Sequence, residues 1–378
     1  MLNPGKVANE LMATTAYSHH GPRTLKCKRL HHAIVQPCYW EDTLRQLCGG
    51  VTDEHGVFQD NSGFHDFFQV KGTYNTNDAI QRNETAIYLG CFIQVWGHVF
   101  TDCFAKLWYL TTAEGQKLIH NNVRLIYLTT DGQPLKPYFK EMFALAGIDI
   151  DSCEHISQLS CFDTLMLPDN SFYIKQRGGG RYFTNEYVQL IANIHDQVSK
   201  ARGTFPEKIY FTRTHYIGGK QDYGERAIEQ CFRQAGFTIV VPEKLTVIQQ
   251  VELVAHCNIY ASTEGSISHN CIFCRKGATV IILKKGHYVN GYQTAINDVR
   301  SLHVIYFDVG LSCFNDRTEP WQGPFFIRPT TQLQVFLGLQ SKTVPLLLNI
   351  DWYRYLLFCN PVTRRLRKTI HTLLRFLR

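Results

Sequence analysis

The feature that most constrains the fold is a regular alternation of short apolar runs and amphipathic stretches that begins near residue 208. Five runs have the length and composition of buried strands: 208–212, 237–241, 258–261, 279–283 and 303–307. Four stretches between them carry apolar residues at helical spacing: 224–236, 246–256, 266–275 and 292–300. Strands that alternate with helices of this length pair in parallel through right-handed crossovers, so this half predicts a doubly wound α/β sheet.

The first half of the chain repeats the alternation less regularly. Strands are predicted at 85–89 and 123–127. Helices are predicted at 97–112, 137–146 and 183–201. Residues 1–80 show no periodicity from which elements can be predicted.

These patterns predict two Rossmann-like α/β domains, at 1–202 and 203–340, followed by a tail at 341–378. The segment 202–206, Arg-Gly-Thr-Phe-Pro, is expected to link the domains. Two open sheets of this kind face each other across a central cleft. Ligands bind there, at the carboxyl ends of the strands.

The end of the chain, 361–378, combines an apolar stripe with a basic face. Apolar residues recur at helical spacing: Leu366, Ile370, Leu373, Leu374 and Leu377. Basic residues fall mostly off that stripe: Arg364, Arg365, Arg367, Lys368, Arg375 and Arg378. Such a helix lies on an anionic membrane surface, where each basic residue contributes about 1 kcal/mol. The alternative is a terminal helix that packs on the body with a solvated basic face.

The formal net charge is +7, and the six basic residues of this tail account for most of it. The body of the chain is therefore close to neutral, which argues against a nucleic-acid partner. A nucleic-acid-binding protein is nevertheless a third possible function. Strong binding to a nucleic-acid duplex that is lost when residues 361–378 are removed would support it.

Thirteen cysteines do not indicate a disulfide framework, because the chain is neither short nor preceded by a recognisable secretory signal. Their number is odd, and several lie inside apolar runs, so most are expected to be buried free thiols. No uninterrupted apolar stretch reaches the roughly 20 residues of a spanning helix. We therefore expect a cytoplasmic protein, peripheral on the inner face of the plasma membrane.

The strongest candidate ligand site is 261–270, Ala-Ser-Thr-Glu-Gly-Ser-Ile-Ser-His-Asn, between a predicted strand and a predicted helix. Gly265 permits close backbone approach, and Ser266 is a good cap for the helix. Free amides at a helix start receive phosphate groups. Arg213, just after the first strand of this half, would complete the anion site. The alternative is a plain strand-to-helix turn.

The second candidate is 96–102, Trp-Gly-His-Val-Phe-Thr-Asp. On a helix His98 and Asp102 share one face, and a carboxylate beside an imidazole orients it and raises its basicity. The pair would suit a general base that deprotonates an acceptor hydroxyl. A helix-capping or core hydrogen-bonded pair is the alternative.

Two further patterns are weaker. His269, Cys271 and Cys274 lack a second ligand pair with zinc spacing, so burial is favoured and no metal is expected. The loop 177–181, Arg-Gly-Gly-Gly-Arg, fails the common phosphate-loop patterns and is predicted to be a loop at the cleft edge.

Three blocks in order resemble glycosyltransferase family 61, and in particular its bacterial capsular polysaccharide biosynthesis type. They are 96–102, then 208–213 (Lys-Ile-Tyr-Phe-Thr-Arg), then 236–277, which includes Glu243 and the Glu264-Gly265-Ser266 segment with His269-Asn270. Animal and plant members tend to have His-Gly-Ala where this chain has Glu-Gly-Ser.

The resemblance implies a GT-B fold, with an acceptor-side domain at 1–202 and a nucleotide-sugar-binding domain at 203–340. It implies an inverting, metal-independent transfer of a hexosyl or pentosyl group, with UDP the usual nucleotide, in capsule or lipopolysaccharide synthesis. The expected partners are a nucleotide-sugar donor and a glycan acceptor, with a lipid-linked acceptor suited to the basic tail. No cofactor is expected.

In this scheme His98, supported by Asp102, is the catalytic base, and Asp102 as the direct base is the alternative. The residues expected to bind the donor are Arg213, Glu243, Glu264, Gly265, Ser266, His269 and Asn270. The competing function is a non-catalytic glycan- or nucleotide-binding protein of a polysaccharide assembly complex.

Overall fold

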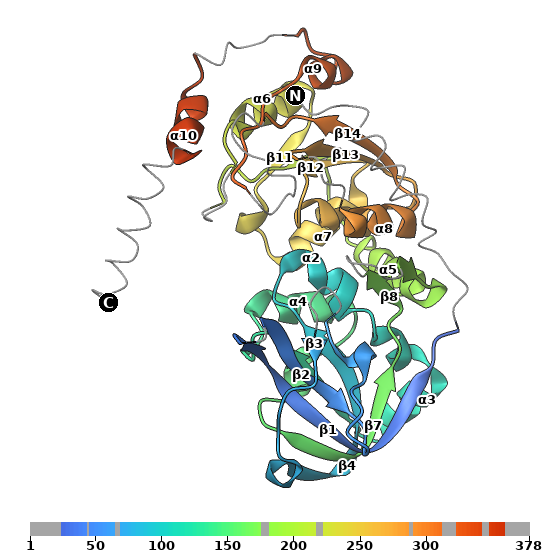
Figure 1. Ribbon diagram of the computed structural model, residues 1–378. Helices are drawn as coiled ribbons and strands as arrows, with labels where there is room; N and C mark the ends of the chain where they lie inside the picture. Colours follow the sequence, from blue (N-terminus) through green and yellow to red (C-terminus); the bar gives the residue numbers. More distant parts are fainter. Residues whose placement is uncertain are drawn as a thin grey trace.

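The computed structural model describes residues 24–43, 45–64, 69–174, 181–216, 222–286, 290–311, 323–341 and 348–359. These residues form a mixed α/β structure around two large sheets that contain parallel strands (Figure 1). The basic tail lies outside the described residues, as does most of the glycine-rich loop at 177–181. Within the described residues, no helix has the length and apolar character needed to cross a membrane.

The first sheet has seven strands in the order β3-β2-β1-β7-β4-β5-β6. Their bounds are β1 Cys27–Glu41, β2 Gln46–Thr52, β3 Gln69–Val70, β4 Ile80–Phe92, β5 Arg124–Thr129, β6 Glu154–His155 and β7 Ser160–Pro168. β7, β4, β5 and β6 pair in parallel, whereas β1 runs antiparallel to β2 and β7. The strands predicted at 85–89 and 123–127 are confirmed as parts of β4 and β5.

The strands β1 and β2 fall in the stretch where no elements were predicted, and their geometry explains why. The β1–β2 register shifts between Gln36 and Tyr39, which interrupts the alternation of buried and exposed side chains. Gly49 in β2 has φ +111°, and a Cβ there would lie 2.5 Å from the carbonyl oxygen of Pro37. A bulge and a close backbone approach thus break the two-residue period on which strand prediction rests.

The helical elements of the first half are short. They are α2 Trp96–His98, the π-helical turn η3 Val99–Cys103, the 3-10 helix η4 Leu107–Thr111, α3 Ala113–His120, α4 Pro137–Leu145 and α5 Asn185–Val198. Three shorter 3-10 turns, η1 Asp60–Ser62, η2 Thr76–Asp78 and η5 Ile150–Ser152, and the hairpin β8 Phe172–Ile174 with β9 Arg181–Phe183 complete this half. The helices predicted at 137–146 and 183–201 are confirmed as α4 and α5.

The prediction of one continuous helix over 97–112 is wrong, because the structure divides this segment into α2, η3 and η4. Val99, Phe100, Cys103, Phe104 and Leu107 are all buried, so this segment is enclosed on several sides. Tertiary packing, and not the amphipathic period of one helix, therefore sets its backbone.

The second sheet is fully parallel, with strand order β11-β10-β12-β13-β14. Its strands are β10 Lys208–Phe211, β11 Thr238–Val240, β12 Ile259–Thr263, β13 Thr279–Lys284 and β14 His303–Asp308. The helices between them are α6 Glu225–Gln234, α7 Val247–His256 and α8 Gly291–Val299, with the 3-10 turn η6 Pro242–Lys244 before α7. The predicted doubly wound sheet is confirmed, and its order reverses between β10 and β12.

The helix predicted at 266–275 is instead the 3-10 helix η7 Ser268–Phe273, which Ile267 precedes without a side-chain cap. The prediction that Ser266 caps a helix is therefore wrong. All six residues of η7 are buried, so it lacks the exposed face of an amphipathic helix. The Ser268 hydroxyl accepts the amide N–H of Gly265 at 3.2 Å and fixes the turn itself.

The two halves share one continuous hydrophobic cluster. It includes Phe92 and Phe100 from the first half and Val251, Phe273 and Ile296 from the second. The rings of Phe100 and Phe273 meet edge to face, with centroids 4.6 Å apart.

The opposite face of the second sheet is covered by α6 and by α9 Thr331–Phe336. The helix α10 Ile350–Cys359 packs on Phe326 through Trp352 and Tyr355. The boundaries predicted for the domains stay predictions.

Candidate active site

The segment that follows β4 brings an imidazole and a carboxylate into contact. His98 Nδ1 lies 2.7 Å from Asp102 Oδ2, and the Thr101 hydroxyl donates to the same oxygen at 3.0 Å. The His98 side chain is 20% exposed, whereas that of Asp102 is 3% exposed. The Asp102 carboxylate engages Nδ1, so a proton transfer with a ligand would use the other ring nitrogen, Nε2. The predicted pairing of His98 with Asp102 is thus present.

The same segment contacts the second half of the chain through its first two residues. The indole Nε1 of Trp96 donates to Asn270 Oδ1 at 2.8 Å. A Cβ on Gly97 would lie 2.4 Å from His269 Nδ1, so glycine permits this close approach. Two motifs that lie far apart in the sequence therefore meet at one junction.

His269 is enclosed at this junction. His269 is 4% exposed, and neither of its ring nitrogens makes a hydrogen bond with the described part of the protein. Burial, and secondarily the nearby His98, lowers the pKa of His269 to about 4. His269 is therefore neutral at neutral pH, and only one imidazole of the two, His98, is partly open to solvent.

Sequence reasoning missed Tyr292, which α8 brings to the same place. Its hydroxyl donates to Asp102 Oδ1 at 3.2 Å, and its ring lies edge to face with His98 at 4.8 Å between centroids. Tyr292 is 190 positions from Asp102 and sits in no recognisable motif, so the sequence carries no signal for this contact.

Several predicted donor-binding residues follow the carboxyl ends of β10 and β12, where the strand order reverses. The Arg213 guanidinium lies over the Tyr216 ring at 4.5 Å, and its backbone N–H donates to Glu225 Oε1 at 2.9 Å. Gly265 and Ser266 are half-buried after β12, and Glu243 is exposed in η6. The structure places Arg213, Gly265 and Ser266 at this edge of the sheet, and no hydrogen bond joins these three described residues.

The Glu264 carboxylate binds groups of the protein itself. Its carboxylate pairs with the Lys284 ammonium and accepts backbone N–H groups from Lys285 at 2.9 Å and Gly286 at 3.2 Å. Both side chains of the pair are almost fully buried. Glu264 thus holds the chain that leaves β13, a role that sequence reasoning did not anticipate.

A second buried ionic network lies beside it. Lys285 donates to Asp222 at 2.8 Å, and both side chains are 2% exposed. Glu225 accepts the Tyr210 hydroxyl and the Arg213 N–H on Oε1, while its Oε2 has no hydrogen bond with the described residues. Burial raises the pKa of Glu225 to about 7, nearby Asp222 adds to the rise, and Lys285 opposes it.

The expected basic membrane residues, Arg364, Arg365, Arg367, Lys368 and Arg375, lie outside the described residues. Cys271 and Cys274 are fully buried, and burial raises the pKa of both thiols. In the part of the chain that the structure describes, no three His, Cys, Asp or Glu side chains cluster as metal ligands.

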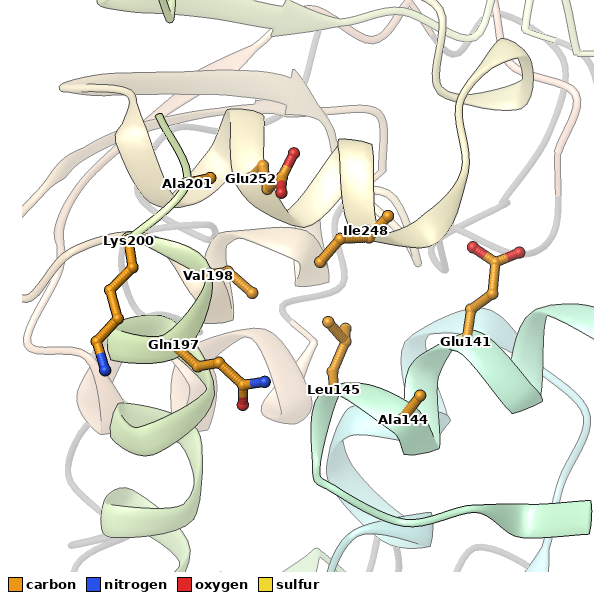
Figure 2. Close-up of a pocket in the computed structure, with 9 residues that line it drawn as sticks. All are labelled: Glu141, Ala144, Leu145, Gln197, Val198, Lys200, Ala201, Ile248 and Glu252. Atoms are coloured by element: carbon orange, nitrogen blue, oxygen red, sulfur yellow. The ribbon is translucent and has the colours of Figure 1, made fainter. Parts of the chain in front are cut away.

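A separate hollow of about 570 Å³ opens where α4, α5 and α7 meet (Figure 2). Its lining is largely aliphatic and also includes the polar residues Glu141, Gln197, Lys200 and Glu252. Glu141 also accepts the backbone N–H of Val247 at 2.8 Å, across the junction of the halves. None of the predicted site residues lines this hollow.

The family model described as Glycosyltransferase 61 matches residues 96–282. That span begins at Trp96, contains all the predicted catalytic and donor-binding residues, and ends within β13. The match supports the glycosyltransferase 61 family, and with it a glycosyltransferase as the class of protein.

Two solved structures of TibC show a weaker likeness. The bacterial iron-containing dodecameric glycosyltransferase TibC from enterotoxigenic E. coli H10407 has 10% identity and a TM-score of 0.28, over 73% of this chain and 81% of that one. The dodecameric iron-containing heptosyltransferase TibC in complex with ADP-D-beta-D-heptose has 10% identity and a TM-score of 0.26, over 71% and 79%. TM-scores this low do not establish a shared fold. No curated protein sequence matches the chain.

Proposed function

We propose that the protein is an inverting glycosyltransferase that moves a sugar from a nucleotide sugar to a glycan acceptor without a metal cofactor. The observation that carries the proposal is the His98–Asp102 pair at the start of the family match, bonded at 2.7 Å. The imidazole is partly exposed and the carboxylate is enclosed, which is the arrangement that a general base and its orienting group require.

In the proposed reaction, His98 Nε2 takes the proton from the acceptor hydroxyl as its oxygen attacks the anomeric carbon. The new carbon–oxygen bond forms on the face opposite the phosphate, so the anomeric configuration inverts. The nucleoside diphosphate leaves with the electron pair of the broken bond. Asp102 stabilises the imidazolium that forms and keeps the ring in one orientation. His98 then releases the proton to solvent.

The proposed donor site lies on the second half, where the strand order of the sheet reverses. Ligands of doubly wound sheets bind at such a point, outside the carboxyl ends of the strands. Arg213 and the Gly265-Ser266 backbone would hold the diphosphate, and Glu243 would contact the ribose or base. His269 and Asn270 reach the segment of the proposed base, which supports a donor site adjacent to it. UDP is the nucleotide that we favour.

We further propose a GT-B arrangement and a role in capsule or lipopolysaccharide synthesis at the inner face of the plasma membrane. The support is the resemblance of the three sequence blocks and the basic, acid-free segment 361–378. A lipid-linked glycan intermediate would suit an enzyme held at that surface.

The test begins with the purified full-length protein and UDP, GDP, CMP and their common sugars, with and without EDTA. A thermal shift that survives EDTA identifies the nucleotide, since a ligand of the folded state raises its apparent stability. Transfer is then measured for wild type, His98→Gln and Asp102→Asn, with His120→Gln as control because His120 is exposed on α3.

We expect kcat to fall by about 10²- to 10⁴-fold in both site variants, with the nucleotide-induced shift retained. The His120 variant should match wild type. Full activity in a His98→Gln/Asp102→Asn double variant would reject the proposed base. Nucleotide binding without any transfer or donor hydrolysis would favour the non-catalytic binding function instead.

A further inference from the structure

The catalytic pair of the first half is contacted by a tyrosine from the second. Tyr292 of α8 is 2% exposed, and its hydroxyl donates to Asp102 Oδ1 at 3.2 Å. Its ring and that of His98 lie edge to face, with centroids 4.8 Å apart and planes at 82°. One side chain thus contacts both members of the pair.

The Asp102 carboxylate is held by groups on both of its oxygens. His98 and Thr101, from its own segment, bind Oδ2 at 2.7 and 3.0 Å. Tyr292 binds Oδ1 from across the junction. With donors at both oxygens, the carboxyl plane is fixed, and so is the direction in which His98 presents Nε2.

Contacts from both halves fix Tyr292 in turn. Its backbone N–H donates to the side chain of Asn290, at the start of α8, at 2.9 Å. Its ring stacks on Phe172 of β8, with centroids 6.1 Å apart and planes at 25°. The hydroxyl therefore reaches Asp102 only while α8 stays packed against the first half.

The other titratable groups that face the pair do not duplicate this contact. Tyr187 of α5 donates its hydroxyl to the carbonyl of Phe100 at 2.5 Å. Asp102 adds to the burial that raises the pKa values of Tyr187 and of the Cys103 thiol, so both stay neutral. His269 of η7 is neutral as well, since burial lowers its pKa to about 4.

We propose that Tyr292 is a positioning residue, which orients the His98–Asp102 base through the Asp102 carboxylate and completes it only when the two halves are packed together. This proposal rests on the proposed function, because the pair is the base of that reaction. It adds that the donor-binding half supplies part of the acceptor-activating machinery.

The test is Tyr292→Phe, which keeps the ring and its packing and removes only the hydroxyl. The control is Tyr74→Phe, which removes a hydroxyl bonded to Thr52 within the first half. We expect kcat to fall by about ten- to a hundredfold in Tyr292→Phe, with the donor KM within about twofold of wild type. The acid limb of the kcat profile should move to higher pH, because an Asp102 with fewer donors stabilises the imidazolium more strongly.

A thermodynamic cycle tests whether Tyr292 acts through Asp102. In an Asp102→Asn background, Tyr292→Phe should cause little further loss of kcat, because its target is already altered. Wild-type kcat and an unmoved pH profile in Tyr292→Phe would overturn the proposal. An equal loss in both backgrounds would overturn it too, since Tyr292 would then act elsewhere.

A readout that needs no catalysis separates this proposal from the proposed function. A proton on His98 Nδ1 that is bonded to the Asp102 carboxylate should give a downfield NMR signal, which His98→Gln identifies by its loss. Tyr292→Phe should shift or broaden this signal, and Tyr74→Phe should not. An unchanged signal overturns the positioning role, whereas a wild-type protein that transfers no sugar overturns only the proposed function.

Discussion

The indole Nε1 of Trp96 donates a hydrogen bond of 2.8 Å to the side-chain oxygen of Asn270, 174 positions further along the chain. Asn270 is 3% exposed, so this bond is shielded from water. It joins the segment of the proposed base to the segment proposed to lie beside the donor. The geometry of one half therefore depends on the other.

Trp96→Phe should weaken this link while it keeps an aromatic ring against Phe100 and Tyr138. The Asn270 oxygen loses a donor in a buried place, which costs about 1–3 kcal/mol of unfolding free energy. Urea denaturation measures this loss, and the proposed reaction should also slow. Trp108→Phe is the matched control, because the Trp108 indole bonds to the Asp169 carbonyl within the first half at 2.8 Å. A similar loss of activity in both variants would contradict a specific role for the junction.

Gly97→Ala should distort the junction from the other side. The added Cβ would lie 2.4 Å from His269 Nδ1, and the His269 ring is buried and has little room to withdraw. Forced contacts of this kind cost about 1–3 kcal/mol, again measurable by urea denaturation. Gly203→Ala is the control, since its Cβ would meet its nearest neighbour at an ordinary 3.4 Å.

The clash at Gly97 also predicts a specific rescue. Adding His269→Ala to Gly97→Ala removes the ring that the new methyl group meets, so the two substitutions should be less destabilising together than their sum. Simple additivity would show that the Gly97 methyl group is accommodated elsewhere.

The second sheet could be predicted from the sequence almost to the residue, and the first could not. Parallel strands buried on both faces give continuous apolar runs, and 279–283 accordingly matches β13 Thr279–Lys284. β1 carries a register shift near Pro37 and packs beside antiparallel β2, so its pattern has no single period. The same limit applies to η3 and η7, where burial on several sides removes the amphipathic signal.

The contacts of the candidate site likewise divide into those that the sequence predicts and those that it does not. The contact of His98 with Asp102 could be predicted because four positions separate them in a local turn. The contacts of Tyr292 with Asp102 and of Gly97 with His269 depend on how the halves pack, and no local spacing encodes them. Glu264 shows a further limit, since a glutamate next to a turn that is predicted to bind a ligand can equally be the buried partner of a lysine.

The buried pair of Lys285 and Asp222 predicts a large, asymmetric effect. Lys285→Met leaves the Asp222 carboxylate enclosed with the Phe325 N–H as its remaining described donor, and breaking such a pair costs about 3–5 kcal/mol. Adding Asp222→Asn should recover part of this loss, because a neutral amide can still accept the Phe325 N–H. The control is Arg233→Met, whose exposed pair with Glu229 is worth about 0–1 kcal/mol. Equal losses in urea denaturation at the two sites would contradict this account.

Glu225 predicts a pH dependence of stability whose sign is opposite to that of an ordinary salt-bridged carboxylate. Burial raises the pKa of Glu225 from 4.5 to about 7, so between these values the folded protein keeps a proton that the unfolded chain has released. Stability falls with pH wherever the folded state binds more protons. The folded state should thus lose up to about 3 kcal/mol from this group as the pH rises through that window.

Glu225→Gln removes this titration and keeps an oxygen that can accept the Tyr210 hydroxyl and the Arg213 N–H. The stability of Glu225→Gln relative to wild type should therefore rise between pH 5 and pH 8. The measurement is urea denaturation of both proteins at several pH values, with Glu186→Gln, an exposed position on α5, as control for the loss of one carboxylate. A difference that stays constant with pH, or that falls, would show that Glu225 is ionised in the folded protein throughout this range. The Arg213 loop would then be tethered to a carboxylate and not to a carboxylic acid.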